Sequence, residues 1–257
     1  VVGVITHFNT NEDRLITMSK PRMPVSEAFR SVRTNLQFSG INTPLKTILI
    51  TSASPSEGKS SIVANIATVF AQSENNVVVV DGDMRRPTLH KIFKLSNRLG
   101  LSDYFIRTPE EMSGVVKQTK VNNLSIITSG SLPPNPSELL GSARMKDVLT
   151  LLTEHFDMVL LDSPPLLAVT DALILAKNVD GVLLVVDPKK TKRGAIRQAI
   201  EQLRRLDARL LGVVLNNIKV KRSSYYYNRD YYYSKQYGRS SDETSRVDAA
   251  ASDTSAG

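Results

Sequence analysis

The sequence contains no cysteine and no tryptophan, and its eight tyrosines are very unevenly placed. Without cysteine the chain forms no disulfide and offers no thiol nucleophile, which fits a reducing compartment. No apolar run approaches the roughly 18 residues that span a bilayer, and the polar first residues do not resemble a signal peptide. The histidines His7, His90 and His155 lack metal-ligand spacing. Disulfide scaffolds, thiol enzymes and histidine metal centres are therefore excluded.

Apolar side chains and positive charge are what the sequence supplies instead. Hydrophobic residues make up 41% of the 257 positions, and the net charge is +8. This length suits one large α/β domain or two small ones. A basic balance suits nucleic acid, anionic lipid and nucleotide phosphates equally well.

Short apolar runs alternate with helical patterns along the chain. The runs predict strands at 46–52, 77–80, 124–128, 157–161, 181–187 and 210–215. Each run is nearly continuous in apolar residues, as in strands that are buried on both faces. Between them lie helical patterns, the clearest of which has Val25, Phe29, Val32 and Leu36 on one face. The predicted fold class is α/β, with a doubly wound, mostly parallel sheet that carries helices on both faces.

Composition divides the chain into four parts. Residues 1–20 lack clear periodicity and are expected to form an arm, and residues 21–218 are expected to form the α/β domain. Residues 219–239 are basic and rich in tyrosine, whereas residues 240–257 are mostly Ser, Asp, Thr and Ala. The last part is predicted to be disordered, because it has too little apolar surface to bury.

The segment ASPSEGKSS, residues 53–61, follows a predicted strand and precedes a predicted helix. A loop in this place that ends in Gly-Lys-Ser is typical of a P-loop, which binds phosphate with backbone N–H groups and the helix N-terminus. Lys59 would reach the β- and γ-phosphates and Ser60 would bind Mg²⁺. Ala53 replaces the usual first glycine, so a surface turn is the alternative. The residues predicted to bind nucleotide are Ser56, Glu57, Gly58, Lys59, Ser60 and Ser61.

Acidic side chains follow two of the predicted strands. Asp81 and Asp83 end the run VVVV, and Asp162 ends MVLL. Ligands of open α/β sheets bind at such strand ends. Asp162 suits the role of holding Mg²⁺, Asp83 could face the same cleft, and Asp81 suits that of a base that accepts a hydroxyl proton. Any one of them alone could be a helix cap, but three beside a phosphate loop indicate a catalytic cleft. Arg85 is expected to offset phosphate charge.

Two surface patterns remain open. Glu27, Arg30 and Arg33 share one helix face, which is either a solvated face or a contact surface for a second copy of the chain. The C-terminal tyrosines, set among basic residues, could stack on single-stranded nucleic acid, rest on anionic lipid or accept phosphate themselves. A repeated tyrosine segment on a phosphoryl-transfer domain favours phosphate acceptance. The cluster consists of Tyr225, Tyr226, Tyr227, Tyr231, Tyr232, Tyr233 and Tyr237.

Six segments together resemble the bacterial tyrosine kinases, a family of P-loop enzymes that control capsule and exopolysaccharide synthesis. ASPSEGKSS, VVVVDGDMRRP and MVLLDSPP resemble the Walker A, A′ and B motifs of that family. PPNPSELL, EAFRSVR and the tyrosine cluster are also similar to it. The resemblance covers roughly residues 18–238.

The resemblance implies an ATP- and Mg²⁺-dependent protein-tyrosine kinase. Lys59 would act on phosphate, with Asp81 the base. Ser60, Asp83 and Asp162 would hold the metal, and Asn216 would contact adenine. Glu27, Arg30 and Arg33 would close a ring of eight subunits. The tail tyrosines would be phosphorylated in trans, and their phosphates would loosen the ring.

The resemblance also implies partners and a location. A transmembrane modulator, fused or separate, would activate the kinase at the inner face of the plasma membrane, and residues 1–20 would be a remnant of it. A tyrosine phosphatase would reset the tail, and no nucleic acid is expected. The rival class is the deviant-Walker ATPases of the partitioning and division-site type. Those proteins have a second lysine where Ser54 stands and glycines at Pro55 and Ser56.

Overall fold

The computed structural model describes residues 1–9, 14–41, 43–105 and 114–219. The chain divides into two compact units, Val1–Ile218 and Lys219–Gly257. The first unit holds the sheet and its helices. The tyrosine cluster and the predicted disordered C-terminus lie outside the described residues.

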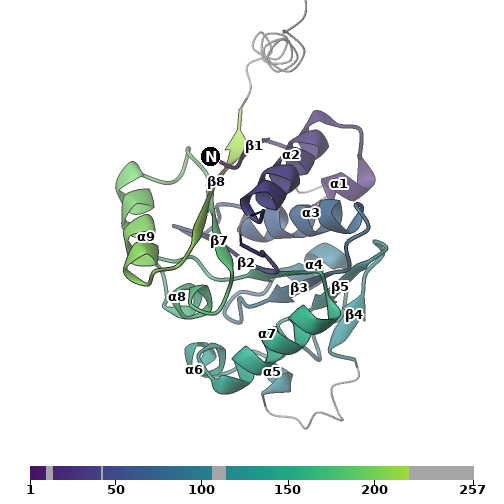
Figure 1. Cartoon of the computed structure of the whole chain (residues 1–257), viewed down its shortest axis with the longest axis vertical. Coiled ribbons are helices and arrows are strands. Elements are labelled where there is room, and N and C mark those ends of the chain that lie inside the picture. Colours follow the sequence, from purple (N-terminus) through teal and green to yellow (C-terminus); the bar gives the residue numbers. More distant parts are fainter. Residues whose placement is uncertain (10–13, 42, 106–113, 220–257) are drawn as a thin grey trace, which may run out of the picture. The chain divides into compact units, whose positions relative to one another are not determined.

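The first unit is built on an eight-stranded sheet with the order β1-β8-β7-β2-β6-β3-β5-β4 (Figure 1). Neighbouring strands are parallel except for β4, which runs antiparallel to β5. Every residue of the central strands β2, β3, β6 and β7 is buried, as the nearly continuous apolar runs predict. The strands are β1 Gly3–Thr6, β2 Thr47–Ser52, β3 Val77–Asp81, β4 Val116–Gln118, β5 Leu124–Ile127, β6 Met158–Asp162, β7 Gly181–Val186 and β8 Leu210–Ile218.

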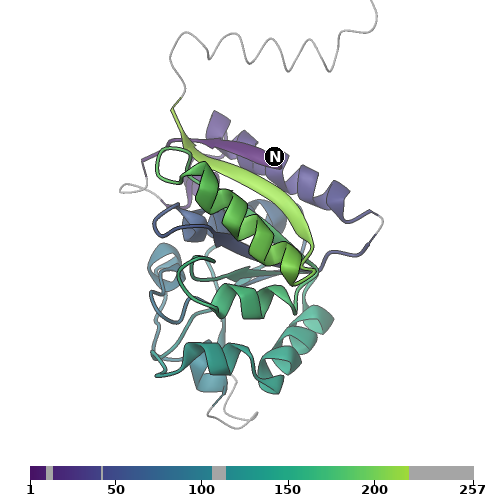
Figure 2. The same cartoon turned by 90° about the vertical axis from the view of Figure 1, so that its left-hand side faces the viewer.

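Helices cover both faces of the sheet (Figures 1 and 2). Alternate side chains of one strand enter different cores: Val77 and Val79 pack on the side of α2 and α3, whereas Val78 and Val80 pack on the side of α7 and α8. The predicted doubly wound α/β fold is thus confirmed. The helices are α1 Ile16–Ser19, α2 Pro24–Ser39, α3 Lys59–Ala71, α4 Leu89–Phe93, α5 Leu101–Tyr104, α6 Pro136–Leu140, α7 Ala143–His155, α8 Asp171–Ala176 and α9 Arg193–Arg205.

Three local expectations differ from the structure. The first concerns residues 1–20, where β1 pairs with β8 and Val2 and Ile5 are buried, so this part is no free arm. A four-residue strand is too short to show a period in the sequence. The second is β4, which no apolar run predicts. The third is the stretch from Ser137 to about His155, for which the sequence predicts one helix with Ser137 as its N-cap. The structure divides this stretch into α6 and α7, and Asn135 precedes the first residue of α6.

None of the helices in the described ranges has both the length and the apolar character that crossing a bilayer requires.

Candidate active site

The P-loop lies between β2 and α3, as the sequence predicts. Gly58 has φ +87°, a conformation that side chains disfavour, and a Cβ atom there would lie 2.3 Å from Nδ2 of Asn216. The 13-residue helix α3 starts at the next residue, Lys59. Its N-terminal N–H groups are a suitable anion site, because α3 leaves them without helical partners. Glycine at this position is therefore required by both strain and space.

Glu57 stabilises the P-loop through hydrogen bonds of its buried side chain and of its backbone. Its side chain is buried and accepts hydrogen bonds from the backbone N–H of Ser54 at 2.6 Å and of Asp187 at 3.0 Å, and from the hydroxyl of Thr191. Its backbone carbonyl accepts a bond from Nδ2 of Asn216 at 2.8 Å. Because its carboxylate is fully engaged, Glu57 can contribute only its backbone to a bound nucleotide.

The predicted acids converge beside this loop. Asp81 and Asp162 are partners in the register of the adjacent strands β3 and β6, and both are completely buried. Asp83 is buried too, and its Oδ2 lies 3.1 Å from Nζ of Lys59. The structure thus brings the P-loop lysine and three carboxylates to one edge of the sheet, as expected from the strand ends.

Burial and mutual charge shift the ionisation of this cluster. Burial raises the pKa of Asp81 well above its usual value, and the charge of Asp162 adds to the effect. Burial also raises the pKa of Asp162, to about 6, against the opposing charge of Lys59. In Lys59 burial lowers the pKa, but attraction to Asp162 and Asp83 outweighs it and the pKa is raised. Carboxyls with raised pKa values suit proton transfer near neutral pH.

Asp162 has one carboxylate oxygen that could bind a metal ion. Its Oδ2 is buried and has no hydrogen-bond partner within the part of the chain that the structure describes. The Ser60 hydroxyl, on the first turn of α3, lowers the pKa of this carboxyl. The described residues hold no cluster of three or more His, Cys, Asp or Glu side chains that could bind a metal unaided. That is the ordinary situation for Mg²⁺, which takes one or two carboxylates and completes its shell with phosphates and water.

Arg85, which the sequence predicts to contact phosphate, is already paired. Its Nε lies 2.9 Å from Oδ2 of Asp171, and Nη2 lies 3.0 Å from Oδ1. Nη2 also donates to the hydroxyl of Ser137 at 3.1 Å. Neither Asp171 nor Ser137 stands out in the sequence as a partner, because each comes from a different helix far along the chain.

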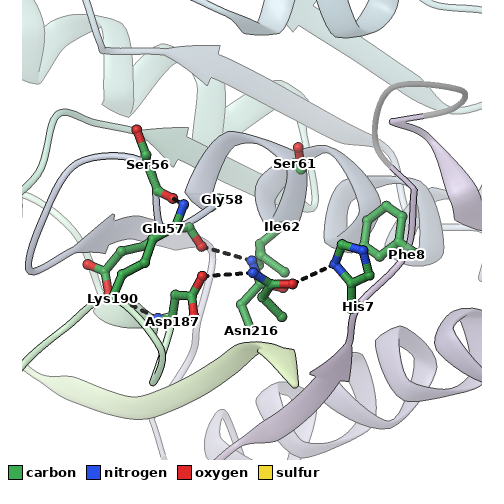
Figure 3. Close-up of a pocket in the computed structure, with 11 residues that line it drawn as sticks. His7, Phe8, Ser56, Glu57, Gly58, Ser61, Ile62, Asp187, Lys190 and Asn216 are labelled. Carbon is green, nitrogen blue, oxygen red and sulfur yellow. Dashed lines mark hydrogen bonds between the residues drawn. The ribbon is translucent and has the colours of Figure 1, made fainter. Parts of the chain in front are cut away.

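A pocket of about 180 Å³ lies beside the loop, at the ends of β1, β7 and β8 (Figure 3). Nδ2 of Asn217 donates to Asp187 at 2.9 Å, and Oδ1 of Asn217 lies 2.6 Å from Nδ1 of His7. The ring of Phe8 is held edge-on to Phe29 of α2. Besides P-loop and α3 residues, the lining consists of His7, Phe8, Asp187, Lys190, Asn216 and Asn217.

Only Asn216 in that lining set is predicted from the sequence. Asp187 ends the run GVLLVV just as Asp162 ends MVLL, so this residue could have been found by the same argument. His7 and Phe8 could not, since they reach the pocket only through the pairing of β1 with β8.

The residues of the predicted contact surface on α2 have partners within the chain. Glu27 and Arg30 form an exposed ion pair, and Arg30 also donates to the carbonyl of Pro21 at 2.9 Å. Arg33 donates to the carbonyl of Val69 at 2.9 Å. Glu27 is the most accessible of the three, with a side chain that is 64% exposed.

A parallel sheet with a glycine-lysine-serine loop and acidic strand ends defines a P-loop NTPase, and comparison with known proteins agrees. The family model ParA, described as NUBPL iron-transfer P-loop NTPase, matches residues 44–252. The putative tyrosine-protein kinase CapB of Staphylococcus aureus is 40% identical over 83% of this chain and 93% of its own length.

Two further comparisons involve a larger protein. The tyrosine-protein kinase etk of Escherichia coli strain K12 is 34% identical over 83% of this chain, which corresponds to 29% of that protein. The solved kinase domain of Escherichia coli ETK is 30% identical, with a TM-score of 0.82, over 87% of this chain and 91% of that domain. The chain belongs to the family of bacterial tyrosine-protein kinases.

Proposed function

We propose that this chain transfers the γ-phosphoryl group of ATP to tyrosine hydroxyls, including those of its own C-terminal cluster. The observation that carries the proposal is the convergence of Lys59 with the buried carboxylates Asp81, Asp83 and Asp162 beside the P-loop. Phosphoryl transfer needs positioned charge more than covalent chemistry, and this cluster supplies it.

The nucleotide would bind across the P-loop. Its phosphates would lie on the N–H groups of Ser56 to Ser61, at the start of α3. Its nucleoside would occupy the pocket beside Gly58, where Asn216 holds the loop carbonyl. Lys59 would exchange its ion pair with Asp83 for the β- and γ-phosphates.

The acids would divide the remaining work. Asp162, whose Oδ2 has no hydrogen-bond partner among the described residues, would hold Mg²⁺ together with Ser60, and Asp83 would contribute from its turn. Bound Mg²⁺ supplies charge neutralisation at the transferring phosphate. The tyrosine oxygen forms a bond to the γ-phosphorus as the bond from that phosphorus to the bridging oxygen of ADP breaks. Asp81 would accept the phenolic proton.

The acceptors would be the seven tyrosines from Tyr225 to Tyr237, presented by another copy of the chain. Support comes from the sequence, since these residues lie outside the described part. Exposure of Glu27 and Arg30 on α2 is compatible with a contact between copies, and with the ring of eight that the resemblance implies. Phosphates on the tail would then loosen that ring by repulsion.

A transmembrane modulator and a tyrosine phosphatase complete the proposal, at the inner face of the plasma membrane. The matches support a modulator that is separate in some relatives and fused in others, because this chain spans 93% of one relative and 29% of another. The process controlled would be capsule or exopolysaccharide synthesis and export, as the resemblance implies.

A deviant-Walker ATPase is the second candidate, because the ParA model shares the fold. Ser54 in place of the second lysine speaks against it, as does the tyrosine cluster, for which such ATPases have no use. A nucleic-acid-binding module would leave the buried acids without a role.

The test is radiolabelled ATP with Mg²⁺ and a modulator peptide, applied to three full-length chains. The unchanged chain should become labelled. Lys59→Met should not, and replacement of all seven tail tyrosines by Phe should remove most of the label. An unlabelled wild-type chain would refute the kinase, and label on Lys59→Met would refute the assigned site. A separate experiment tests the ring by measuring the mass of the assembly in solution. Changing Glu27, Arg30 and Arg33 to Ala should lower this mass, and an unchanged mass would refute their role in the ring.

A further inference from the structure

Asp171 is a completely buried carboxylate outside the cluster of acids already described. It is the first residue of α8, and the structure gives its side chain two partners. Arg85 binds both of its oxygens in a fork, at 2.9 and 3.0 Å, and the hydroxyl of Ser137 donates to Oδ1 at 2.8 Å. Such a bidentate contact between a planar guanidinium and a carboxylate fixes the orientation of both side chains as well as pairing their charges.

The Ser137 hydroxyl is both a hydrogen-bond donor and a hydrogen-bond acceptor. It donates to Asp171 and accepts a hydrogen bond from Nη2 of Arg85 at 3.1 Å. This serine belongs to the segment PPNPSELL, for which the kinase site above has no use. The three side chains come from the turn after β3, from α6 and from α8, so together they join three separate elements.

The turn that carries Arg85 begins directly after Asp81, the last residue of β3, and also carries Asp83. Met84 is buried in the same core as residues of α7 and α8, and Arg85 forms an ion pair with Asp171 at the start of α8. Between these anchors and β3, the carboxylate of Asp83 accepts the N–H of Arg86 at 2.9 Å and meets Lys59. Gly82 is pressed against the carbonyl of Asp162, where a Cβ atom would approach to 2.7 Å.

We propose that Ser137 and Asp171 are positioning residues of phosphoryl transfer. They act through Arg85 to hold Asp81, at the end of β3, and Asp83, in the turn that follows, at the correct position relative to Lys59. The proposal rests on the kinase function proposed above. It assigns PPNPSELL to the support of the active site, although none of its side chains needs to touch ATP. A displacement of this turn by a fraction of an ångström would reduce turnover rather than nucleotide binding.

The test measures kcat and KM of the full-length chain with modulator peptide, with the full-length Lys59→Met chain as acceptor. Ser137→Ala should lower kcat about tenfold and leave KM for ATP within about twofold. Ser137→Thr, which keeps the hydroxyl, should recover most of the loss. Ser142→Ala is the matched control, because Ser142 donates to the carbonyl of Leu139 on the same connection, at 2.7 Å, and does not contact Arg85.

Asp171→Asn and Arg85→Lys should lower kcat at least as far, since each breaks the fork. If either fails to fold, Ser137→Ala still decides. A kcat for Ser137→Ala equal to that of the wild type, an equal loss in Ser142→Ala, or no recovery in Ser137→Thr would overturn the proposal. Phosphorylation by the wild-type chain in the same assay shows separately whether the kinase function holds.

Discussion

The two sides of the P-loop differ in chemistry and in origin. On one side, the central strands β3 and β6 end in buried acids that share the charge of Lys59. On the other side, β7, β8 and the edge strand β1 end around a pocket whose lining includes Asp187 and Lys190 besides amides, a histidine and an aromatic ring. Three buried carboxylates gather where phosphate and metal would react, whereas the pocket where the nucleoside would lie combines amide and aromatic groups with Asp187 and Lys190.

From this difference we expect catalysis and nucleotide binding to depend on different sides of the loop. Interactions made only in the transition state affect kcat, whereas those made equally in the ground state affect KM. Changes on the acidic side should therefore lower turnover, and changes on the pocket side should weaken nucleotide affinity.

Asp81→Asn should have the largest effect. The change removes the proposed proton acceptor but keeps its size, and we expect kcat to fall by about 10² to 10³. The measurement is the initial rate of phosphotyrosine formation, with affinity for a fluorescent ATP analogue as the control. Loss of affinity in step with the rate would mean that Asp81 serves binding, and the two sides would not be separate.

Asp162→Asn tests how much the buried charge of Asp162 destabilises the fold, through the pH dependence of the melting temperature. Since the pKa of Asp162 is raised from 3.8 to about 6, its contribution to stability is present at low pH and lost as pH rises through about 6. The asparagine stays neutral, so the ligand-free variant should melt a few degrees higher than wild type at pH 7.5. One pKa unit corresponds to ~1.4 kcal/mol, and ~1 kcal/mol shifts Tm by about 2–4 °C.

At pH 4.5 this difference should be clearly smaller, because the folded-state carboxyl is then protonated, and it should approach zero below the unfolded-state pKa of 3.8. Differential scanning calorimetry without Mg²⁺ or nucleotide measures both values. Asp157→Asn is the control, because this exposed acid at the other end of β6 accepts a backbone hydrogen bond from Asn76. An advantage of equal size at both pH values would show that the gain does not come from charge.

Asn216→Ala should act on the pocket side. Without its amide, the carbonyl of Glu57 loses a 2.8 Å hydrogen bond and the P-loop loses support under Gly58. We expect KM for ATP to rise about tenfold with kcat within about twofold. A fall in kcat at saturating ATP would contradict the division between the two sides.

Phe8→Ala should have the smallest effect. It removes an apolar wall of the pocket, so affinity for ATP should fall about threefold while that for inorganic triphosphate is unchanged. Titration calorimetry with both ligands measures this, and Phe8→Leu should lie between the two. Equal losses for both ligands would mean that Phe8 supports the loop rather than the nucleoside.

The residues that follow buried central strands were predictable from the sequence. The runs before Asp81 and Asp162 are apolar without interruption, and the polar residue that ends such a run must lie at the sheet edge. Helix α2 was equally clear, because its buried positions repeat at helical spacing over four turns. In both cases the pattern is local.

Residues that depend on distant pairing were not predictable. Arg85 was expected at the phosphates, yet Asp171 and Ser137 hold it from two other helices. His7 and Phe8 lie in a stretch expected to be an arm, and reach the pocket because the short strand β1 pairs with β8. Short elements and single polar contacts leave no period in a sequence.

The position of the P-loop, the acidic residues at the ends of the central strands and the class of chemistry could all be predicted from the sequence, because each follows from a contiguous pattern. Three points came from the packing of the whole chain: Glu57 hydrogen-bonds within its own loop, Asn216 lies beside Gly58, and Oδ2 of Asp162 has no hydrogen-bond partner among the described residues. These outcomes depend on the register of the sheet and on which buried polar groups can form hydrogen bonds with each other once water is excluded. Both are properties of the whole packed chain.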